Sequence, residues 1–287
     1  MRYSCPLMVL LAAVSASAVS AQIRDVLKRK EIDAMFSLTT RDRAVHEMPN
    51  YAIWFQVRSG KPGPAELHRN ADAILFVRRG NATVSLGGEL AEAKESAPGE
   101  FLGAGIRRAR AHAVGAGDVV HIPRGTPHRI DPGSGRFEYA VVRVFPTGDN
   151  LPHQTGSLAP RHMPELVKSS QIDATIASFD TNQPLHGAKN YTINYVIYKG
   201  RSGPWEAHRG CVDIYFIRAG TGRAELGGEI SNAKEETPGE IRGDGVKGAR
   251  VYEIGPGDMV VIPRHGAHHV TPLGEKLGYL LVKVWAE

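Results

Sequence analysis

GDVVHIPRGTPH, at Gly117–His128, returns almost unchanged as GDMVVIPRHGAH at Gly257–His268. The offset between the two stretches is 140 residues. The same offset relates GKPGPAELH at Gly60–His68 to GRSGPWEAH at Gly200–His208. Each stretch combines turn residues with a short apolar run and ends in histidine. The chain is therefore built from two copies of one unit, and every position can be compared with its twin.

The repeat needs no gap from Leu27, opposite Val167, to Phe145, opposite Trp285. A period of this length exceeds the roughly 20–50 residues of solenoid repeats. It matches the size of a whole domain. We predict two tandem domains, residues 22–145 and 164–287. The Pro/Gly-rich residues 146–163 are expected to link them.

Each unit reads as a series of short apolar or β-branched runs separated by glycine and proline. This pattern predicts an all-β sandwich or barrel rather than a parallel α/β sheet. A jelly roll of two packed sheets is the natural arrangement. Helix is expected only before the first long strand of each unit, near Ile23–Phe36 and Pro164–Ser178. The strands expected in the first unit are Tyr51–Val57, Ala73–Val77, Ala82–Leu86, Val119–Ile122 and Tyr139–Val144.

The first 21 residues have the pattern of a signal peptide. Arg2 precedes an apolar run, Pro6–Val14, and small residues follow up to Ala21. This order of a basic start, an apolar core and a small-residue cleavage site is typical of export signals. We expect a secreted or periplasmic protein that keeps no membrane anchor after cleavage. An uncleaved anchor is the alternative, although the run is short for a bilayer.

The overall composition excludes some classes of partner. The formal net charge is only +5, and no basic stripe interleaved with aromatic residues is present. We therefore expect no nucleic-acid binding. A small-molecule ligand and possibly a homodimer are the partners that we predict. Cleavage after Ala21 would leave Cys211 as the one cysteine, for which a buried apolar role is expected.

These motifs resemble those of the cupin superfamily, and the resemblance covers both units. Gly117, Pro123, Gly125 and His128 match the second cupin motif, and in the second unit only the glycine differs, being His265. The first cupin motif usually runs His-x-His, then a glutamate, then a glycine. Both units have Glu-x-His in its place. The resemblance implies two cupin-type jelly-roll barrels in tandem, similar to secreted bacterial cupins with a Glu-x-His motif.

The second unit carries four candidate metal ligands, Glu206, His208, Asp213 and His268. Residues two apart on a strand face the same side, so Glu206 and His208 point together. The resemblance implies that all four converge inside the barrel. Two imidazoles and two carboxylates suit Mn, Fe, Zn or Ni. One or two divalent ions are therefore expected in the chain.

The first unit carries a weaker candidate site, Glu66, His68 and His128. Ala73 stands at the acidic position, where it cannot bind a metal. Asp72 is one residue early and should face the other side of its strand. His112 and His121 could replace the missing ligand, although packed and hydrogen-bonded roles are the commoner ones for such residues.

The resemblance leaves two functions open. One is a metal-dependent enzyme of the oxygenase, decarboxylase or isomerase type, acting on a small polar or carboxylated molecule. Tyr215, which should share the interior with Asp213, is then a candidate catalytic residue. Two-barrel oxalate decarboxylases use His-x-His with Glu in both halves, so Glu66 and Glu206 depart from their pattern. The other is a non-catalytic, small-molecule-binding or storage-like protein with a structural metal or none.

Overall fold

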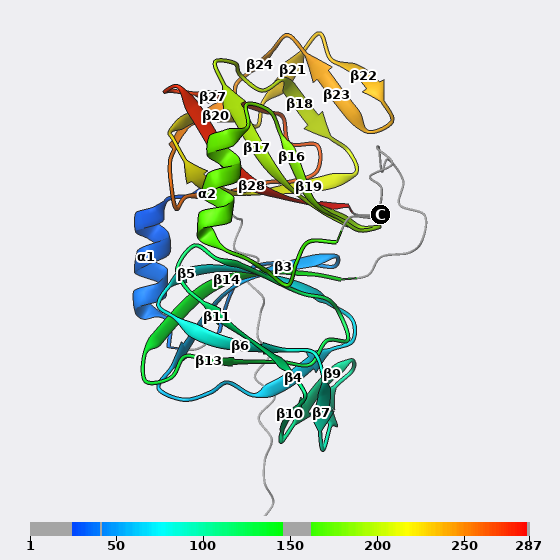
Figure 1. The fold of residues 1–287 in the computed structure, drawn as a ribbon. Coiled ribbons are helices and arrows are strands. Elements are labelled where there is room, and N and C mark those ends of the chain that lie inside the picture. Colours follow the sequence, from blue (N-terminus) through cyan, green and yellow to red (C-terminus); the bar gives the residue numbers. More distant parts are fainter. Residues whose placement is uncertain (1–24, 41, 146–161, 286–287) are drawn as a thin grey trace, which may run out of the picture.

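The computed structural model describes residues 25–40, 42–145 and 162–285, which form two β-barrels packed against each other (Figure 1). In Figure 1 the first barrel lies below the second, and both helices run along one side. The predicted signal peptide, residues 1–21, lies outside the described residues, as do residues 146–161 of the predicted linker. The predicted all-β, two-barrel fold is confirmed.

The first barrel has, in the described part of the chain, two six-stranded antiparallel sheets and one two-stranded sheet. The inner sheet faces the second barrel, and the outer sheet faces solvent. The inner sheet runs β15 (Leu166–Val167), β12 (Val119–Ile122), β5 (Asp72–Arg79), β14 (Arg136–Val144), β3 (Tyr51–Ser59) and β2 (Arg43–Met48). The outer sheet runs β11 (Arg110–Val114), β6 (Ala82–Leu86), β13 (His128–Asp131), β4 (Ala65–His68), β9 (Glu100–Gly103) and β8 (Lys94–Ala97), and the two-stranded sheet pairs β10 (Gly105–Arg107) with β7 (Glu89–Ala91).

The second barrel repeats this arrangement strand for strand. Its inner sheet runs β1 (Val26–Leu27), β26 (Met259–Ile262), β19 (Cys211–Ala219), β28 (Lys276–Trp285), β17 (Tyr191–Lys199) and β16 (Gln183–Gly187). Its outer sheet runs β22 (Lys234–Thr237), β23 (Glu240–Gly243), β18 (Trp205–His208), β27 (His268–Pro272), β20 (Gly222–Leu226) and β25 (Arg250–Ile254), and its two-stranded sheet pairs β21 (Glu229–Ser231) with β24 (Gly245–Lys247).

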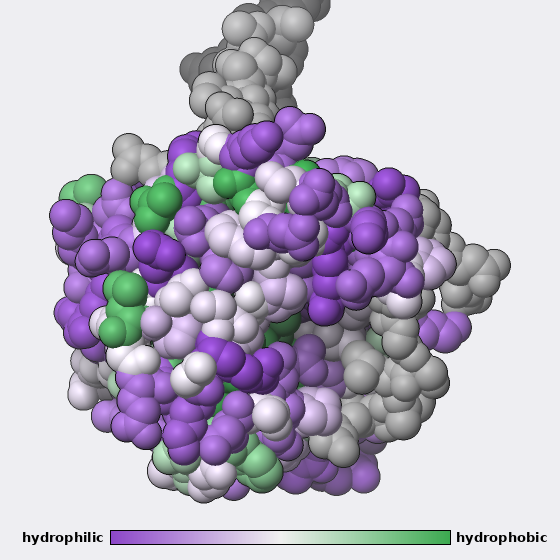
Figure 2. Space-filling model, turned by 90° about the horizontal axis from the view of Figure 1, so that it is seen from above, coloured by the Kyte–Doolittle hydropathy of each residue, from purple (hydrophilic) through white to green (hydrophobic). Residues whose placement is uncertain are grey.

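The burial pattern of the strands distinguishes the two kinds of sheet. In β6 the residues Ala82, Val84 and Leu86 are buried, and Thr83 and Ser85 between them are not. Such alternation is expected where one face packs on a core and the other meets water. Strands β5 and β14 of the inner sheet are buried along both faces. Figure 2 shows one face of the molecular surface, on which hydrophilic residues predominate and apolar residues are scattered.

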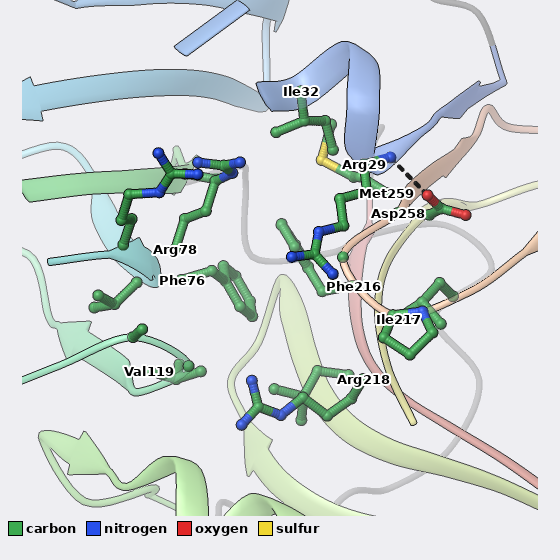
Figure 3. A pocket seen from close by; sticks show the side chains of 18 of the residues that line it. Arg29, Ile32, Phe76, Arg78, Val119, Phe216, Ile217, Arg218, Asp258 and Met259 are labelled. Atoms are coloured by element: carbon green, nitrogen blue, oxygen red, sulfur yellow. Dashed lines mark hydrogen bonds between the residues drawn. The ribbon is translucent and has the colours of Figure 1, made fainter. Parts of the chain in front are cut away.

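Three apolar cores follow from this layering. One fills the interior of each barrel. The third lies between the barrels, where side chains of both inner sheets and both helices meet. At its centre Phe76 and Phe216 stack with ring centroids 3.6 Å apart, beside a pocket (Figure 3). Because this central core draws on both units, the two barrels form one packed body.

The chain exchanges short strands between the barrels. Strand β1 precedes the first barrel, yet it pairs with β26 of the second, Val26 opposite Val260. Strand β15 precedes the second barrel, yet it pairs with β12 of the first, Val167 opposite Val119. Helices α1 (Arg29–Leu38) and α2 (Ser169–Ser178) follow these strands and each packs on its own barrel. The sequence-based boundaries at residues 22 and 164 did not anticipate this exchange.

Two buried aspartates hold the exchanged segments. The Oδ1 atom of Asp258 accepts a hydrogen bond of 2.6 Å from the backbone N–H of Arg29, and its Oδ2 atom pairs with Lys28. Asp118 does the same for Ser169, at 2.8 Å, and for Lys168, at 2.9 Å. A carboxylate is favourable at a helix N-terminus, where N–H groups lack partners within the helix. Each helix is thus capped by the opposite barrel.

The C-terminal ends of the helices are bound by cations of their own barrels. Arg136 donates to the carbonyl oxygen of Phe36 at 2.6 Å, and Lys276 donates to that of Ile176 at 3.0 Å. Positive charge stabilises this end of a helix. Each helix therefore bridges a carboxylate of one barrel and a cation of the other.

We predict that Asp118→Asn and Asp258→Asn each destabilise the protein. Both carboxylates are buried and accept several hydrogen bonds, and the amide would keep their shape while removing their charge. Loss of such charge-assisted bonds costs about 1–3 kcal/mol. Urea denaturation should show a loss of this size in the free energy of unfolding. Asp244→Asn, at an exposed position, is the matched control, and an equal loss there would contradict the prediction.

A cluster of buried histidines lies between the barrels. Nε2 of His121, on β12, is 2.8 Å from the hydroxyl oxygen of Tyr191, and its ring centroid is 4.6 Å from that of His186. Burial, reinforced by His186 and His162, lowers the pKa of His121 to about 3, against a weaker opposite effect of Glu165. The unfolded chain, with a histidine pKa of about 6.5, therefore takes up this proton first.

We predict that acid weakens the protein through this cluster. Stability from neutral His121 is complete above about pH 6.5 and is lost progressively as the pH falls toward 3. The loss by pH 5 amounts to as much as about 2 kcal/mol. His121→Val introduces the residue of the twin position, Val261, and should flatten the fall in unfolding free energy between pH 6.5 and 5. His265→Asn, at an exposed histidine, should keep the wild-type slope, and a slope unchanged in His121→Val would refute the assignment.

Candidate metal centre

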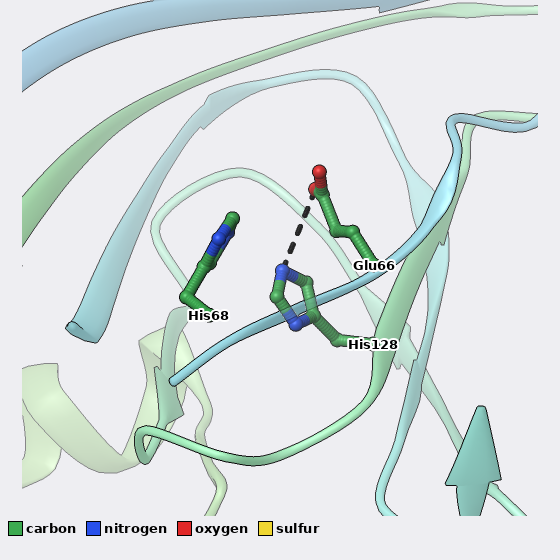
Figure 4. A group of neighbouring side chains, drawn as sticks. All are labelled: Glu66, His68 and His128. Carbon is green, nitrogen blue, oxygen red and sulfur yellow. Dashed lines mark ion pairs between the residues drawn. The ribbon is translucent and has the colours of Figure 1, made fainter. Parts of the chain in front are cut away.

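The first barrel brings Glu66, His68 and His128 together, as predicted (Figure 4). Glu66 and His68 are two residues apart on β4, and His128 begins β13, directly opposite Glu66 in the sheet. One ligand atom from each residue lies within 4.8 Å of the others. Nε2 of His128 is 3.5 Å from Oε1 of Glu66, the ion pair drawn in Figure 4.

The second barrel repeats the cluster with Glu206, His208 and His268. Oε1 of Glu206 lies 3.5 Å from Nε2 of His268 and 4.0 Å from Nε2 of His208. Ligand atoms bound tetrahedrally to one ion by bonds of about 2.1 Å stand roughly 3.4 Å apart. The three atoms are thus close to the separation that a single divalent ion requires.

Hydrogen bonds fix the imidazoles in the form that a metal needs. Nδ1 of His128 is 3.0 Å from the carbonyl oxygen of Thr126, and Nδ1 of His268 is 3.0 Å from that of Gly266. A carbonyl only accepts, so each Nδ1 carries the proton and each Nε2 presents its lone pair to the interior. Such outer partners are typical of metal-binding histidines.

The other histidine of each cluster is held by a glutamate. Nδ1 of His68 is 2.5 Å from Oε2 of Glu100, and Nδ1 of His208 is 2.8 Å from Oε2 of Glu240. These glutamates begin β9 and β23, within the long segment between the cupin motifs. The sequence analysis assigned them no role. The signal was available, because Pro-Gly-Glu recurs at the 140-residue offset.

Asp213 lies beside the second cluster, although it is not among the residues whose ligand atoms all lie within 4.8 Å of one another, and its role as a fourth ligand stays a prediction. Its Oδ2 atom is 3.4 Å from Nε2 of His208 and 3.9 Å from Nε2 of His268. Although burial opposes ionisation, Lys283 and His208 hold the pKa of this carboxyl well below its usual range. Asp213 is therefore an anion inside the barrel. Ala73, its twin, supplies no charge.

A cation from the last strand of each barrel reaches the cluster, and the sequence analysis missed both. Arg143, on β14, donates to Nε2 of His68 at 3.1 Å. Lys283, on β28, lies 3.2 Å from Nε2 of His208 and 3.8 Å from Oδ1 of Asp213. The two residues are twins in the repeat. Each cation approaches the nitrogen through which a metal would bind.

The equivalent histidines differ in their affinity for protons. Burial lowers the pKa of His68 to about 4, and Arg143 adds to this effect. Burial also lowers the pKa of His208, but Asp213 and Glu240 outweigh it and raise the pKa to about 9. His68 is therefore neutral at pH 7, whereas His208 holds a proton that a metal must displace.

The fixed charges also differ between the two clusters. In the first, Glu66 and Glu100 are opposed by Arg143, which leaves one negative charge if the histidines are neutral. The second has three carboxylates, Glu206, Asp213 and Glu240, opposed by Lys283 and by Arg242, which lies 3.6 Å from Oε2 of Glu206, so it also leaves one. The net charges are therefore equal, and the clusters differ in the buried carboxylate of Asp213, which the first barrel lacks. This additional carboxylate favours the second barrel as the stronger site.

The cavity at the first cluster is small. It measures about 10 Å³ and is lined by the three predicted ligands together with residues such as Gln56, Tyr139 and Arg143. Space of this size holds about one water molecule or one ion. An organic molecule would need side chains to move before it could enter the first barrel.

Tyr215 lies inside the second barrel, as predicted, and its hydroxyl donates to Oδ2 of Asp213 at 3.4 Å. Burial raises the pKa of this hydroxyl well above its usual value. The geometry makes Tyr215 a partner of Asp213. Its catalytic role stays a prediction. Cys211 is buried, as expected, but its thiol donates to Oδ1 of Asp213 at 3.8 Å and is therefore more than an apolar filler.

The alternative ligands considered for the first barrel lie elsewhere. Asp72 accepts a hydrogen bond of 2.6 Å from the backbone N–H of Arg124, on the opposite face of β5. His112 is 3.0 Å from Glu165, and His121 belongs to the cluster between the barrels. None of the three supplies the ligand that Ala73 lacks.

Comparison with known proteins identifies the fold. No protein-family model and no curated protein matches the chain. Among solved structures, a cupin 2 conserved barrel domain protein from Leptotrichia buccalis covers 92% of this chain and 99% of its own, at 10% identity and a TM-score of 0.59. Oxalate decarboxylase from Bacillus subtilis covers 85% of this chain and 72% of its own, at 16% identity and a TM-score of 0.48. With its two jelly-roll barrels and a Glu-x-His cluster in each, the chain is by fold a two-barrel cupin, a bicupin.

Proposed function

We propose that this bicupin is a metal-dependent enzyme whose chemistry takes place in the second barrel. The observation that carries the proposal is the arrangement of His208 and His268. Both direct Nε2 toward Glu206 and Asp213, while Nδ1 of each is held by an outer partner. Three or four such ligands leave coordination positions for water or substrate. The substrate class we propose is a small polar or carboxylated molecule.

The ligand set suits Mn, Fe, Zn or Ni, because imidazole and carboxylate together accept all four. When bound, such an ion supplies Lewis acidity and, for Fe or Mn, access to oxygen chemistry. Oxygenation, decarboxylation and isomerisation are the reaction types in keeping with this site. Glu240 would keep His208 in the required orientation throughout.

Lys283 gives the site a means of recognising an anion. Its ammonium group lies 3.2 Å from Nε2 of His208 and 3.8 Å from Oδ1 of Asp213. A metal ion bound through Nε2 of His208 would take the place of this contact. In the metal-bound protein, Lys283 is left with Asp213 and is free to pair with a carboxylate of the substrate. Tyr215 would fix the orientation of Asp213 by its hydrogen bond.

The first barrel supports a second candidate function. Its cavity of about 10 Å³ has room for an ion but no room for an organic substrate. An ion at Glu66, His68 and His128 would therefore stabilise the barrel without taking part in chemistry. If the second barrel behaved in the same way, the protein would be a non-catalytic, storage-like or binding bicupin.

Export is also part of the proposal. The signal-peptide pattern of residues 1–21 supports a secreted or periplasmic location. Within the described residues, neither helix is long or apolar enough to cross a membrane. A small-molecule ligand, the absence of nucleic-acid partners and a possible homodimer remain predictions from the sequence.

We predict that the two clusters differ in metal affinity. His208→Ala with His268→Ala should remove more bound metal than His68→Ala with His128→Ala, because the second cluster has the additional buried carboxylate of Asp213. Elemental analysis after loading with Mn, Fe, Zn or Ni measures this difference. Each pair of substitutions is the matched control for the other, since the positions are twins. Equal losses from the two pairs would contradict the ranking, and wild-type protein without metal would overturn the proposal.

We predict opposite effects of Lys283→Met on metal binding and on turnover. Removing a positive charge beside the ion should raise the metal affinity of the second barrel at least about tenfold. Turnover of small carboxylates should fall, because the substrate loses its counter-charge. Oxygen uptake, CO₂ release and isomer formation are measured over a panel of small hydroxy and keto acids.

Arg143→Met, the same change at the twin position, is the control for this experiment. It should leave turnover unchanged, since the first barrel has no room for substrate. Metal binding without turnover of any compound in wild-type protein would favour the non-catalytic function. Turnover that survives in the His208→Ala, His268→Ala protein would place the chemistry outside the second barrel.

A further inference from the structure

A pocket of about 370 Å³ lies between α1 and the two barrels (Figure 3). Its volume falls within the roughly 300–1,000 Å³ typical of small-molecule sites. None of the residues of the two metal clusters lines it. It is therefore separate from the site of the proposed function.

The floor of the pocket is apolar and comes from both units. Phe76 and Phe216 stack there with an interplanar angle of 11°. The two are twins in the repeat, so they mark the axis that relates the barrels. Ile32 and Phe36 of α1 complete the floor on one side. A ligand with an apolar body would be desolvated by all of these side chains at once.

Arginines surround this floor, and Figure 3 shows Arg29, Arg78 and Arg218 around it. Arg78 pairs with Glu138 at 2.5 Å and with Asp33, and Arg218 pairs with Asp173 at 2.9 Å.

Arg29 differs from these two arginines. Its guanidinium forms no ion pair with a carboxylate in the part of the chain that the structure describes. Its stem lies against Gly257, since a Cβ atom there would be 3.0 Å from Cδ of Arg29. Arg29, which is exposed to solvent, thus brings to the rim a charge that no carboxylate of the described residues pairs with.

The positive charges of the rim act on one another. Burial lowers the pKa of Arg78, Glu138 opposes this effect, and the neighbouring charges of Arg79 and Arg29 add smaller lowering effects. Like charges this close are stabilised by an anion that contacts them. The two carboxylates that line the pocket, Asp118 and Asp258, are already engaged by Lys168 and Lys28. An anionic group is therefore the missing partner.

The repeat explains why only one side is open. Residues of α1 line the pocket, whereas the lining includes no residue of α2. At the twin of Arg29, Ser169 is bound by Arg218, which closes that side. Ile176 of α2 packs onto Gly278, where the first unit has Glu138, a residue that draws Arg78 toward itself. Divergence of these pairs has opened a pocket beside α1.

We propose that this pocket binds a small organic carboxylate with an apolar body. The apolar body lies on Phe76, Phe216 and Phe36, and the carboxylate pairs with the Arg29 guanidinium. Because the floor belongs to both barrels and to α1, a bound ligand stabilises their association. Ligand binding here is thus linked to the stability of the whole chain.

The test uses 2-naphthoate, titrated into the full chain by calorimetry, with thermal unfolding as a second readout. One molecule should bind per chain and raise the unfolding temperature. 2-Naphthamide, which has the same rings without the charge, should bind at least about tenfold more weakly, the effect of one lost charge-assisted hydrogen bond. Equal binding of acid and amide, or no binding of the acid at 1 mM, would overturn the proposal.

Three variants locate the site. Arg29→Gln should weaken 2-naphthoate binding at least about tenfold, whereas Lys30→Gln, a neighbouring exposed charge outside the pocket, should not. Ala140→Leu places in the pocket lining the residue type found at the twin position, Leu280. The larger side chain should fill part of the pocket and abolish 2-naphthoate binding. Circular dichroism confirms that each variant folds. Unchanged binding in Arg29→Gln and Ala140→Leu would refute this location.

The His208→Ala, His268→Ala protein separates the inference from the proposed function. It should bind 2-naphthoate as wild type does while losing metal. Loss of both together would mean that the ligand sits in the barrel, against the proposal.

Discussion

The contact on which the rest of this structure depends is the pair of buried carboxylates, Asp118 and Asp258. Each caps a helix that belongs to the other barrel and accepts from the lysine before it. A helix N-terminus left without such a partner inside a protein would cost the desolvation of its N–H groups. The caps therefore fix where β1 and β15 can pair. Since each barrel completes its inner sheet with a strand of the other, neither is a self-sufficient domain.

This constraint explains why the two inner sheets are buried on both faces. A jelly roll that stood alone would need polar residues on the outside of both sheets. Here the outer face of each inner sheet meets the other barrel, and Phe76 and Phe216 stack between them. The apolar side chains that the pairing buries form the largest of the three cores. The second copy of the unit therefore covers the apolar face that the first copy would otherwise expose to water, and the first does the same for the second.

The sequence predicted the barrels and the metal clusters for physical reasons that operate locally. Strand periodicity and turn residues show in a short window, and Glu66 with His68 share a face by spacing alone. The exchange of β1 and β15 gave no such signal, because a two-residue strand does not specify its partner. Arg143 and Lys283 were missed for a similar reason. They lie 75 residues from the histidines they contact, on strands whose pattern is otherwise apolar.

Twin positions carry information on the metal ligands and also on the residues that hold those ligands in place. Applied to ligands, the comparison of twins identified Ala73 and Asp213 as the difference between the clusters. Asp213 is one of the groups that raise the pKa of His208 to about 9, whereas burial and Arg143 lower the pKa of His68 to about 4. Applied to Glu100 and Glu240, the same comparison would have pointed to the outer partners of His68 and His208. Identity between copies marks what both barrels need.

Difference between copies marks where the barrels have separated in role, and it occurs in two places. Inside the barrels, Ala73 and Asp213 set the charge available to a metal. The second place is the axis between the barrels, where the pocket is open beside α1 and closed beside α2. The twin pairs that differ there are Arg29 with Ser169 and Glu138 with Gly278. A repeat with perfect symmetry would place two equal half-pockets at the axis or none. One pocket, lined by α1 and closed beside α2, requires that symmetry to be broken. The asymmetry that leaves the first barrel with Ala73 in place of Asp213 therefore has a counterpart at the interface, where α1 lines a pocket and α2 does not.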